Sequence, residues 1–498
     1  MIRARSMVME SLNIKYVPKE YVKVSDRLSI DSRAIKGKNI MLSHSVERIE
    51  DDSLIFLGRV LEHTPTIDYF GFNVWLDVSY PFVVLVPGRR GTGKSYTLGI
   101  LAEGLNLTKN ETPTTTKKTR HSAVIIDTLG QFWQMKYKPN ANDYEGKKQL
   151  RDLVDWGLAP LAMDDIQVFA PRGMKIAEFW REFSIKFCEV EVGELTGLLD
   201  VDLYQDRMGQ LLLHIYERVE EGGYQSAHID EETNEVIKGD FVPLSRDFDI
   251  DDLIKCIDSD HEIISKTTGF EVQTRRALRN RLMIMNKWKI FSERGTPINE
   301  IVKEGTLTVI DLESADQDLR NLVVAVLTRK IFQARSEARK REKLAETGGP
   351  SASGKGAPLL MPLWLIIDEA HEYCPATGRT AAKEPLIRFA KEGRSIGLGL
   401  MMATQQPSAL SEKISSQTEI LISHALAFAN DIQSLENRLV NKKVEVFHGK
   451  NESHSFEDQI RLISPGTAFV SMVNVSSVFL LMLRPRLTMH GGKAPKMG

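Results

Sequence analysis

The sequence predicts an α/β fold dominated by a parallel β-sheet, and three observations support this class. Short, almost entirely apolar runs recur along the 498 residues, and stretches with helical periodicity separate them. One of these runs leads directly into a glycine-rich turn, and another ends in two acidic residues. Parallel strands buried on both faces read as continuous apolar runs, and helices between them are typical of βαβ units. We therefore expect a parallel sheet whose strands are buried on both faces.

Six apolar runs are the candidate strands of this sheet. They are FVVLVP (82–87), AVIID (123–127), IQVFA (166–170), LTVID (307–311), LWLIID (363–368) and GLGLMMAT (397–404). Each has the length and composition of a buried strand. Residues 81–174 and 296–466 are accordingly expected to form two parts of one core.

Three other regions surround this core. Up to residue 80, short β-prone runs such as LIFL (54–57) and FNVWL (72–76) alternate with charged turns, which predicts a small β module. Between residues 175 and 295 helical periodicity dominates, as in LYQDRMGQLLLHIYERVEE, which predicts an all-helical insertion. The last segment, 467–498, contains an apolar stretch interrupted by Asn474 and several serines, which predicts a pair of strands.

Composition limits the function classes. Hydrophobic residues make up 42% and charged residues 27% of the chain, which excludes collagen-like, coiled-coil and wholly disordered proteins. The three cysteines are far apart and form no CxxC pair, so we expect neither a disulfide framework nor a structural zinc site. The small number of cysteines also predicts a reducing, cytoplasmic location. We expect no secretory signal and no membrane span. The formal net charge is −2, so affinity for nucleic acid would require a local basic surface.

A phosphate-binding loop is the clearest motif. GRRGTGKS, Gly88 to Ser95, fits the pattern GxxxxGK[S/T] and lies between a buried strand and an amphipathic helix. In such loops backbone N–H groups cradle phosphates at a helix N-terminus, the lysine bridges the β- and γ-phosphates, and the hydroxyl binds Mg²⁺. The expected ATP-binding residues are Gly88, Arg90, Gly91, Thr92, Gly93, Lys94, Ser95 and Tyr96, with Asp127 at the end of a neighbouring strand. Arg89 and Arg90 are unusual there and either clamp phosphate or are solvated.

The segment LWLIIDEAH places Asp368 and Glu369 at the carboxyl end of a buried strand, where open α/β sheets bind ligands. Asp368 is expected to help Ser95 hold Mg²⁺, and Glu369 to polarise the attacking water, which would make the protein a hydrolase. The alternative is an acidic N-cap to the next helix. Gln405, after the strand GLGLMMAT, either contacts the γ-phosphate or the attacking water or is an ordinary loop residue.

With these motifs and the stretch KEGRSIGLGLMMATQQPSAL (391–410), the chain resembles the HerA branch of the HerA/FtsK motor ATPases. The resemblance implies a RecA-like P-loop core with an N-terminal β-barrel-like module and C-terminal strands that brace the neighbouring subunit. It implies a homo-hexamer in which Arg394 acts as an arginine finger on the neighbour's ATP. It also implies helicase or translocase activity on double-stranded DNA. The partner would be a NurA-type nuclease or, in antiviral defence operons, a sirtuin-type NADase or another effector.

The residues that would contact DNA are harder to identify from the sequence, and two functions other than a DNA motor are considered. Three basic segments, 108–120, 273–289 and 329–343, either line a DNA channel or are solvated surfaces. The weak basic signal leaves room for a nucleotide-gated ring scaffold that assembles and activates a partner effector without productive translocation. A small-molecule P-loop kinase is disfavoured because its acceptor pocket needs no residue such as Arg394.

Overall fold

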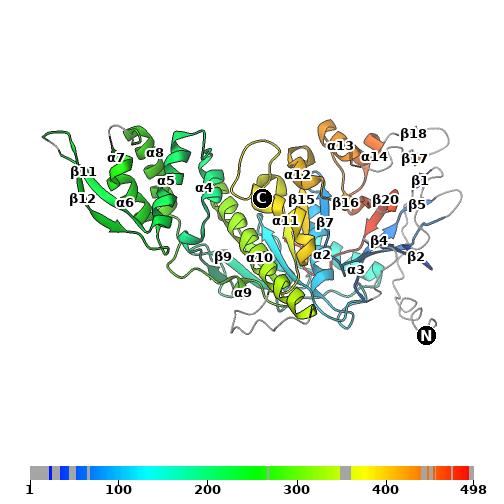
Figure 1. Cartoon of the computed structure of the whole chain (residues 1–498). Coiled ribbons are helices and arrows are strands. Elements are labelled where there is room, and N and C mark those ends of the chain that lie inside the picture. The colour runs from blue at the N-terminus through cyan, green and yellow to red at the C-terminus, as the bar shows by residue number, and fades with distance from the viewer. Residues whose placement is uncertain are drawn as a thin grey trace.

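A computed structural model describes most of the chain. The described residues are 22–24, 34–43, 52–63, 68–230, 232–265, 269–347, 360–438, 446–447, 453–454, 456–472 and 475–492. Most of the strands join one twisted sheet, which helices cover on both faces (Figure 1). The α/β class and the dominance of parallel pairing are confirmed.

The core of the sheet consists of eight parallel strands in the order β10-β9-β13-β8-β14-β15-β7-β16. They are β7 (Val83–Pro87), β8 (Ser122–Asp127), β9 (Gln167–Pro171), β10 (Arg181–Phe183), β13 (Leu307–Asp311), β14 (Leu363–Ile367), β15 (Leu398–Thr404) and β16 (Ile420–Ser423). All six candidate strands are present. The pattern missed β10, which is short and largely exposed, and β16, whose apolar run is only three residues long.

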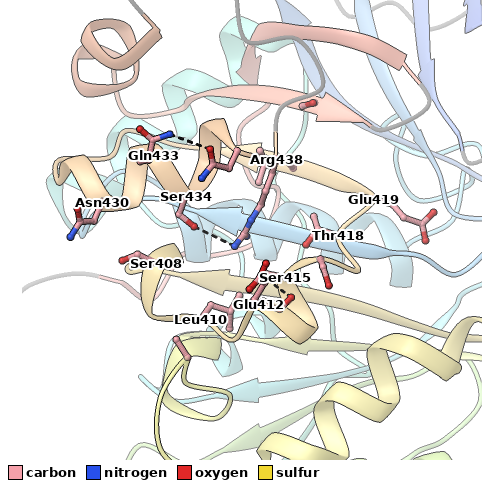
Figure 2. Close-up of a pocket in the computed structure, with 15 residues that line it drawn as sticks. Ser408, Leu410, Glu412, Ser415, Thr418, Glu419, Asn430, Gln433, Ser434 and Arg438 are labelled. Carbon is pink, nitrogen blue, oxygen red and sulfur yellow. Dashed lines mark hydrogen bonds between the residues drawn. The ribbon is translucent and has the colours of Figure 1, made fainter.

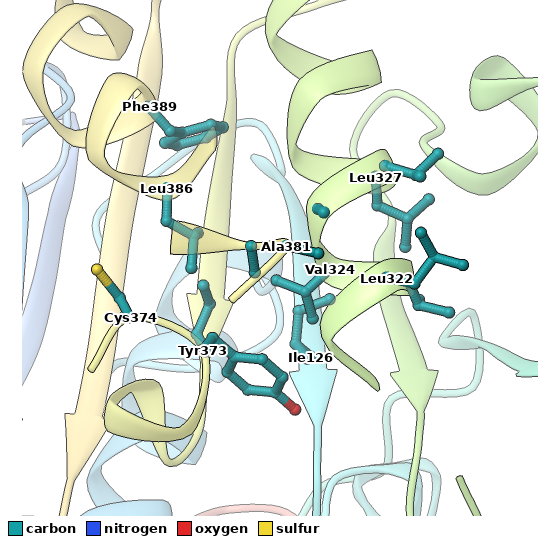
Figure 3. Packing of buried hydrophobic residues seen from close by; sticks show 14 of the residues in the cluster. Ile126, Leu322, Val324, Leu327, Tyr373, Cys374, Ala381, Leu386 and Phe389 are labelled. Atoms are coloured by element: carbon teal, nitrogen blue, oxygen red, sulfur yellow. The ribbon is translucent and has the colours of Figure 1, made fainter. Parts of the chain in front are cut away.

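Alternate residues of the core strands enter two hydrophobic clusters, one on each face of the sheet. Val84 and Ile125 belong to the cluster with α2 (Lys94–Asn106) and α3 (Tyr144–Trp156). Figure 3 shows the opposite cluster, which contains Ile126 and side chains of α10 (Gln317–Glu346) and α11 (Lys383–Glu392), such as Leu322, Leu386 and Phe389. The two-sided burial explains why the strands read as unbroken apolar runs.

Strands from both ends of the sequence extend this sheet. Beyond β16 it continues antiparallel through β19 (Thr467–Met472), β20 (Val475–Leu483), β4 (Leu54–Val60) and β6 (Asn73–Asp77). At this end β3 (Asn39–Leu42) pairs parallel with β6, and β2 (Ile35–Lys36) pairs antiparallel with β3. The expected strand pair near the C-terminus is therefore β19 and β20. Among the described residues of the predicted barrel-like module, β2, β3, β4 and β6 continue the core sheet, because β20 pairs directly with β4.

A small second sheet and several short helices complete this part of the molecule. The four-stranded sheet has the order β18-β17-β1-β5, formed by β18 (Ser453–His454), β17 (Val446–Phe447), β1 (Val22–Val24) and β5 (Glu62–His63). The short helices are α9 (Ile298–Ile301), α12 (Glu412–Ser415), α13 (Ala429–Glu436), α14 (Phe456–Leu462), η3 (Trp133–Lys136), η4 (Phe187–Glu189), η5 (Ala370–Glu372), η6 (Gly393–Ile396) and η7 (Pro407–Ala409). No helix among the described residues is long and apolar enough to cross a membrane.

The insertion projects from one end of the core (Figure 1) and is not wholly helical. Its helices are α4 (Val192–Leu199), α5 (Arg207–Glu221), α6 (Ile250–Ser259), α7 (His261–Ile264) and α8 (Val272–Asn286). Between α5 and α6, β11 (Gly223–Ile229) and β12 (Val236–Pro243) form an antiparallel hairpin. This hairpin makes the prediction of an all-helical insertion wrong. The sequence did not indicate it, because β12 is exposed along most of its length and lacks the apolar alternation of a half-buried strand.

A buried carboxyl next to β20 predicts a pH-dependent stability. Burial raises the pKa of Glu62 to about 8, while the backbone N–H of Leu480 donates to Glu62 Oε1 over 2.6 Å. Between the unfolded value of about 4.3 and this folded value, the folded state keeps a proton that the unfolded state loses, so the free energy of unfolding falls as pH rises. Glu62→Gln, which mimics the protonated form, should therefore stabilise the protein by on the order of 3 kcal/mol at pH 7 and hardly at all at pH 4.5.

Denaturant titrations of both proteins at the two pH values would measure this difference. A stability change of equal size at pH 4.5 and pH 7 would contradict the assignment, because only an ionisation difference makes it vary with pH.

Candidate nucleotide site

The glycine-rich loop connects β7 to α2 at the carboxyl edge of the parallel sheet. Its position is fixed from both sides, because the N–H of Gly88 donates to the Thr404 carbonyl over 3.1 Å and that of Arg89 to the Ala425 carbonyl over 2.8 Å. Gly91 and Gly93 have φ angles of 77° and 117°, in the left-handed region that favours glycine. The loop thus ends in the free N–H groups of a helix N-terminus, which attract anions.

The expected metal and lysine groups converge beside this loop. The Ser95 hydroxyl donates to Asp368 Oδ2 over 2.8 Å, and Lys94 Nζ lies 3.9 Å from Glu369 Oε1. Asp368 is fully buried, and burial together with the nearby Glu369 raises its pKa to about 6. Burial lowers the pKa of Lys94. A hydroxyl and a carboxylate side by side are the hard oxygen ligands that suit Mg²⁺, which otherwise keeps waters and phosphates.

Glu369 is held in place by the residues after β15. Its backbone adopts a left-handed φ of 53°, unusual for a residue with a side chain. The Gln405 side-chain amide donates to Glu369 Oε1, and the Gln405 N–H donates to Oε2 over 3.3 Å. Gln405 and Glu369 thus lie together, a contact between adjacent strand ends that the sequence does not reveal.

Sequence reasoning missed His371, which lies next to this pair. His371 Nδ1 is 3.6 Å from Glu369 Oε2 and 3.2 Å from the Thr404 hydroxyl. The available signal was its position as the last residue of the DEAH segment, two residues after Glu369. Contact with a carboxylate and a hydroxyl orients the imidazole toward the site.

Two predicted nucleotide-binding residues have other partners in the chain. Both oxygens of Asp127 accept backbone N–H groups, from Leu129 over 3.3 Å and from Phe132 over 2.7 Å. Burial, reinforced by Asp311, raises the pKa of Asp127 to about 7. The Tyr96 hydroxyl accepts the Arg486 N–H over 2.7 Å. Asp127 therefore caps the turn after β8, and Tyr96 joins α2 to the C-terminal segment.

The arginines expected at the site are divided between two places. Arg89 and Arg90 are exposed on the loop itself. Arg394 lies in η6, before β15, and its Nη1 is 3.5 Å from Glu419 Oε1. Because β15 has seven residues and strands rise about 3.3 Å per residue, Arg394 is on the order of 20 Å from the edge that carries the loop of its own chain.

A polar cavity lies apart from the loop. It has a volume of about 1010 Å³ and lies between the η7–α12 segment and α13, as Figure 2 shows. Its lining is mostly hydroxyl and amide groups, with Glu412, Glu419 and Arg438 as charged members. Glu419 also lines the small cleft that contains Arg394, so the two hollows adjoin.

The first basic segment, 108–120, is not a loose surface loop. Thr114 and Thr115 are buried against β4, where the N–H of Phe56 donates to the Thr114 carbonyl over 2.9 Å. The Lys117 ammonium is buried and donates to the Leu105 carbonyl. The stretch 114–117 therefore packs inside the fold, while Lys109 and Lys118 on either side of it are exposed.

Most cations of the segment 329–343 form ion pairs within the chain, whereas fewer of those in 273–289 do. In α10, Arg329 contacts Glu194 over 2.7 Å and Arg335 contacts Glu342 over 2.6 Å. In α8, Arg279 contacts Asp258 over 3.0 Å. These pairs neutralise much of the positive charge of α10, whereas Arg276 and Arg281 of α8 are exposed.

The fold and the loop define a P-loop nucleotide-binding protein, with the loop on one parallel strand and the acidic pair on the second strand along. The family model described as "Helicase HerA, central domain" matches residues 83–331, half of the chain. The chain belongs to this family.

Individual relatives match over shorter segments. "DNA double-strand break repair helicase HerA" of Sulfolobus acidocaldarius is 31% identical over 142 residues, 27% of this chain and 26% of the relative. The protein of the same name from Pyrococcus furiosus is 29% identical over 184 residues, 34% of this chain and 32% of the relative. The chain thus spans about a third or less of the length of these relatives.

Among solved structures, VirB4 of Thermoanaerobacter pseudethanolicus aligns with 88% of this chain and 97% of its own, at 12% identity and a TM-score of 0.46. The plasmid coupling protein TrwB in complex with ADP and Mg²⁺ aligns with 82% of this chain and 87% of its own, at 13% identity and a TM-score of 0.45.

Proposed function

We propose that the protein hydrolyses Mg-ATP at the loop Gly88–Ser95. Lys94 binds the β- and γ-phosphates, and Ser95 with Asp368 holds the magnesium ion. Bound there, the ion would neutralise phosphate charge. Glu369 accepts a proton from the attacking water, and Gln405 holds the carboxylate in position. The observation that carries this proposal is the convergence of Ser95 on Asp368 over 2.8 Å and of Gln405 on Glu369.

The energy of hydrolysis is proposed to drive movement along double-stranded DNA in a homo-hexameric ring. Family membership supports the motor, and the named relatives are DNA repair helicases. The distance of Arg394 from its own loop supports a ring, since an arginine on the far edge of the sheet cannot reach its own chain's nucleotide and would have to act on a neighbouring subunit's. A partner nuclease of the NurA type, or a defence effector such as a sirtuin-type NADase, would then act on the DNA or respond to it.

A second candidate function is a nucleotide-gated ring scaffold that assembles and activates a partner effector without productive translocation. The pairing of Arg329, Arg335 and Arg279 with carboxylates favours it, because a DNA channel needs cations that are free to meet phosphates. The two candidates share the nucleotide site and differ in whether duplex DNA changes the rate of hydrolysis.

The deciding experiment measures steady-state ATP hydrolysis with and without duplex DNA at several salt concentrations. The motor predicts a rate that rises with duplex and a stimulation that falls as salt is raised, since phosphate contacts release counterions. Displacement of a DNA triplex strand in the presence of ATP would then report translocation directly. Hydrolysis at the same rate with and without duplex, together with partner activation that depends on ATP, would favour the scaffold.

A further inference from the structure

A buried histidine lies directly beneath the phosphate-binding loop. His424 follows β16 and is fully buried. A Cβ placed on Gly93 would come within 3.1 Å of His424 Cε1, and one placed on Gly88 within 2.6 Å of His424 Cβ. The imidazole therefore occupies the space against which both ends of the loop pack, and any side chain on either glycine would displace it.

Both ring nitrogens of His424 are hydrogen-bonded. Nδ1 lies 3.0 Å from the Thr467 carbonyl, and Nε2 lies 2.8 Å from the Thr97 hydroxyl. A carbonyl oxygen only accepts, so Nδ1 carries the proton and Nε2 accepts the hydrogen of Thr97. Burial lowers the pKa of His424 to about 4, which keeps the ring neutral at physiological pH.

These contacts join three elements at the loop. Thr97 is in the first turn of α2, Thr467 begins β19, and the N–H of His424 donates to the Pro87 carbonyl over 2.9 Å where β7 enters the loop. A buried histidine with satisfied hydrogen bonds is often only part of a core. Here, however, its partners are the helix that ends the loop and the strand that precedes it.

We propose that His424 is a positioning residue that fixes the loop and the start of α2 against β19, so that the loop N–H groups are preset for phosphate. This inference rests on the proposed nucleotide site. It also means that a displacement of β19 or β20 is transmitted to the loop through one neutral imidazole. Neither the loop motif nor the acidic pair contains this residue.

The test uses substitutions that remove one hydrogen bond at a time. Thr97→Val keeps the shape of Thr97 and removes the hydroxyl, Thr97→Ser keeps the hydroxyl, and His424→Asn keeps a donor to Thr467 while losing the acceptor. Equilibrium binding of a fluorescent ATP analogue with Mg²⁺ gives Kd for each full-length variant, at a temperature where thermal melts show it folded. Lys94→Ala gives the baseline without loop binding.

Thr97→Val and His424→Asn should each raise Kd by about 3- to 10-fold, the effect of one lost neutral hydrogen bond. The double variant should bind like either single one, because both changes break the same contact. Thr97→Ser should bind nearly as well as the wild type. If His424→Asn fails to fold, the milder Thr97→Val decides the matter.

Wild-type Kd in folded Thr97→Val, or equal weakening in Thr97→Ser and Thr97→Val, would overturn the positioning role and leave the proposed function intact. A wild-type protein that binds the analogue no better than Lys94→Ala would overturn the proposed function, and this inference with it.

Discussion

Replacement of Arg394 by alanine is expected to lower the ATPase rate of the assembled protein by about 10³- to 10⁵-fold, the effect of losing an arginine finger. The physical reason is the loss of a fixed positive charge where negative charge develops on the transferred phosphoryl group. Because Arg394 lies in η6, across the length of β15 from its own loop, nucleotide affinity of a dilute, unassembled subunit should stay at the wild-type level. Rates and affinities measured across a range of protein concentrations would separate the two effects.

A mixing experiment tests whether Arg394 acts on a neighbour. Arg394→Ala subunits keep an intact Glu369, and Glu369→Gln subunits keep an intact Arg394. If the finger acts in trans, mixing the two inactive proteins creates interfaces with both residues intact and restores part of the activity. If mixtures that are shown to co-assemble stay inactive, or if Arg394→Ala lowers the hydrolysis rate of dilute monomers as much as that of the assembled protein, the trans assignment fails.

Glu369→Gln is expected to lower hydrolysis by about 10²- to 10⁴-fold while nucleotide binding persists. The substitution keeps the size of the side chain but removes the base that accepts the proton of water. The matched control is Glu372→Gln, the same change three residues along, where the carboxylate lies 3.8 Å from Arg320 and serves no proposed catalytic step. Single-turnover hydrolysis and binding of the same ATP analogue measure the two steps separately.

Equal losses in Glu369→Gln and Glu372→Gln would point to a general electrostatic effect in this acidic region and against Glu369 as the base. Loss of nucleotide binding in Glu369→Gln would instead indicate that the Glu369 carboxylate contributes to binding ATP, through its contact of 3.9 Å with Lys94.

Features encoded locally were predictable from the sequence. The strand that leads into the loop is a continuous apolar run because both its faces are buried, and the loop needs glycine at Gly91 and Gly93 because their φ angles are positive. The acidic pair follows its strand directly, so its place at the carboxyl edge of the sheet followed from parallel pairing. Each of these signals lies within a short segment, so it can be recognised without knowing the tertiary structure.

Features created by distant contacts were not predictable. His424 reads as one polar residue after a short apolar run, and only the packing of β16 beside β7 brings it under the loop. The hairpin β11–β12 is exposed, so its sequence carries no alternation that distinguishes it from a loop. The ion pair of Arg329 with Glu194 was likewise not predictable, because the two residues lie 135 positions apart in the sequence.

In the sheet, β20 lies between β19 and β4, and this position has a consequence for synthesis on the ribosome. Arg59 pairs with Met482, so β4 emerges long before the strand that will hold it. At about 5–20 residues per second, that wait lasts on the order of tens of seconds. During it the edge of β4 that β20 will cover stays open to pairing with other nascent chains, which makes this edge a place where chaperone binding during translation would matter most.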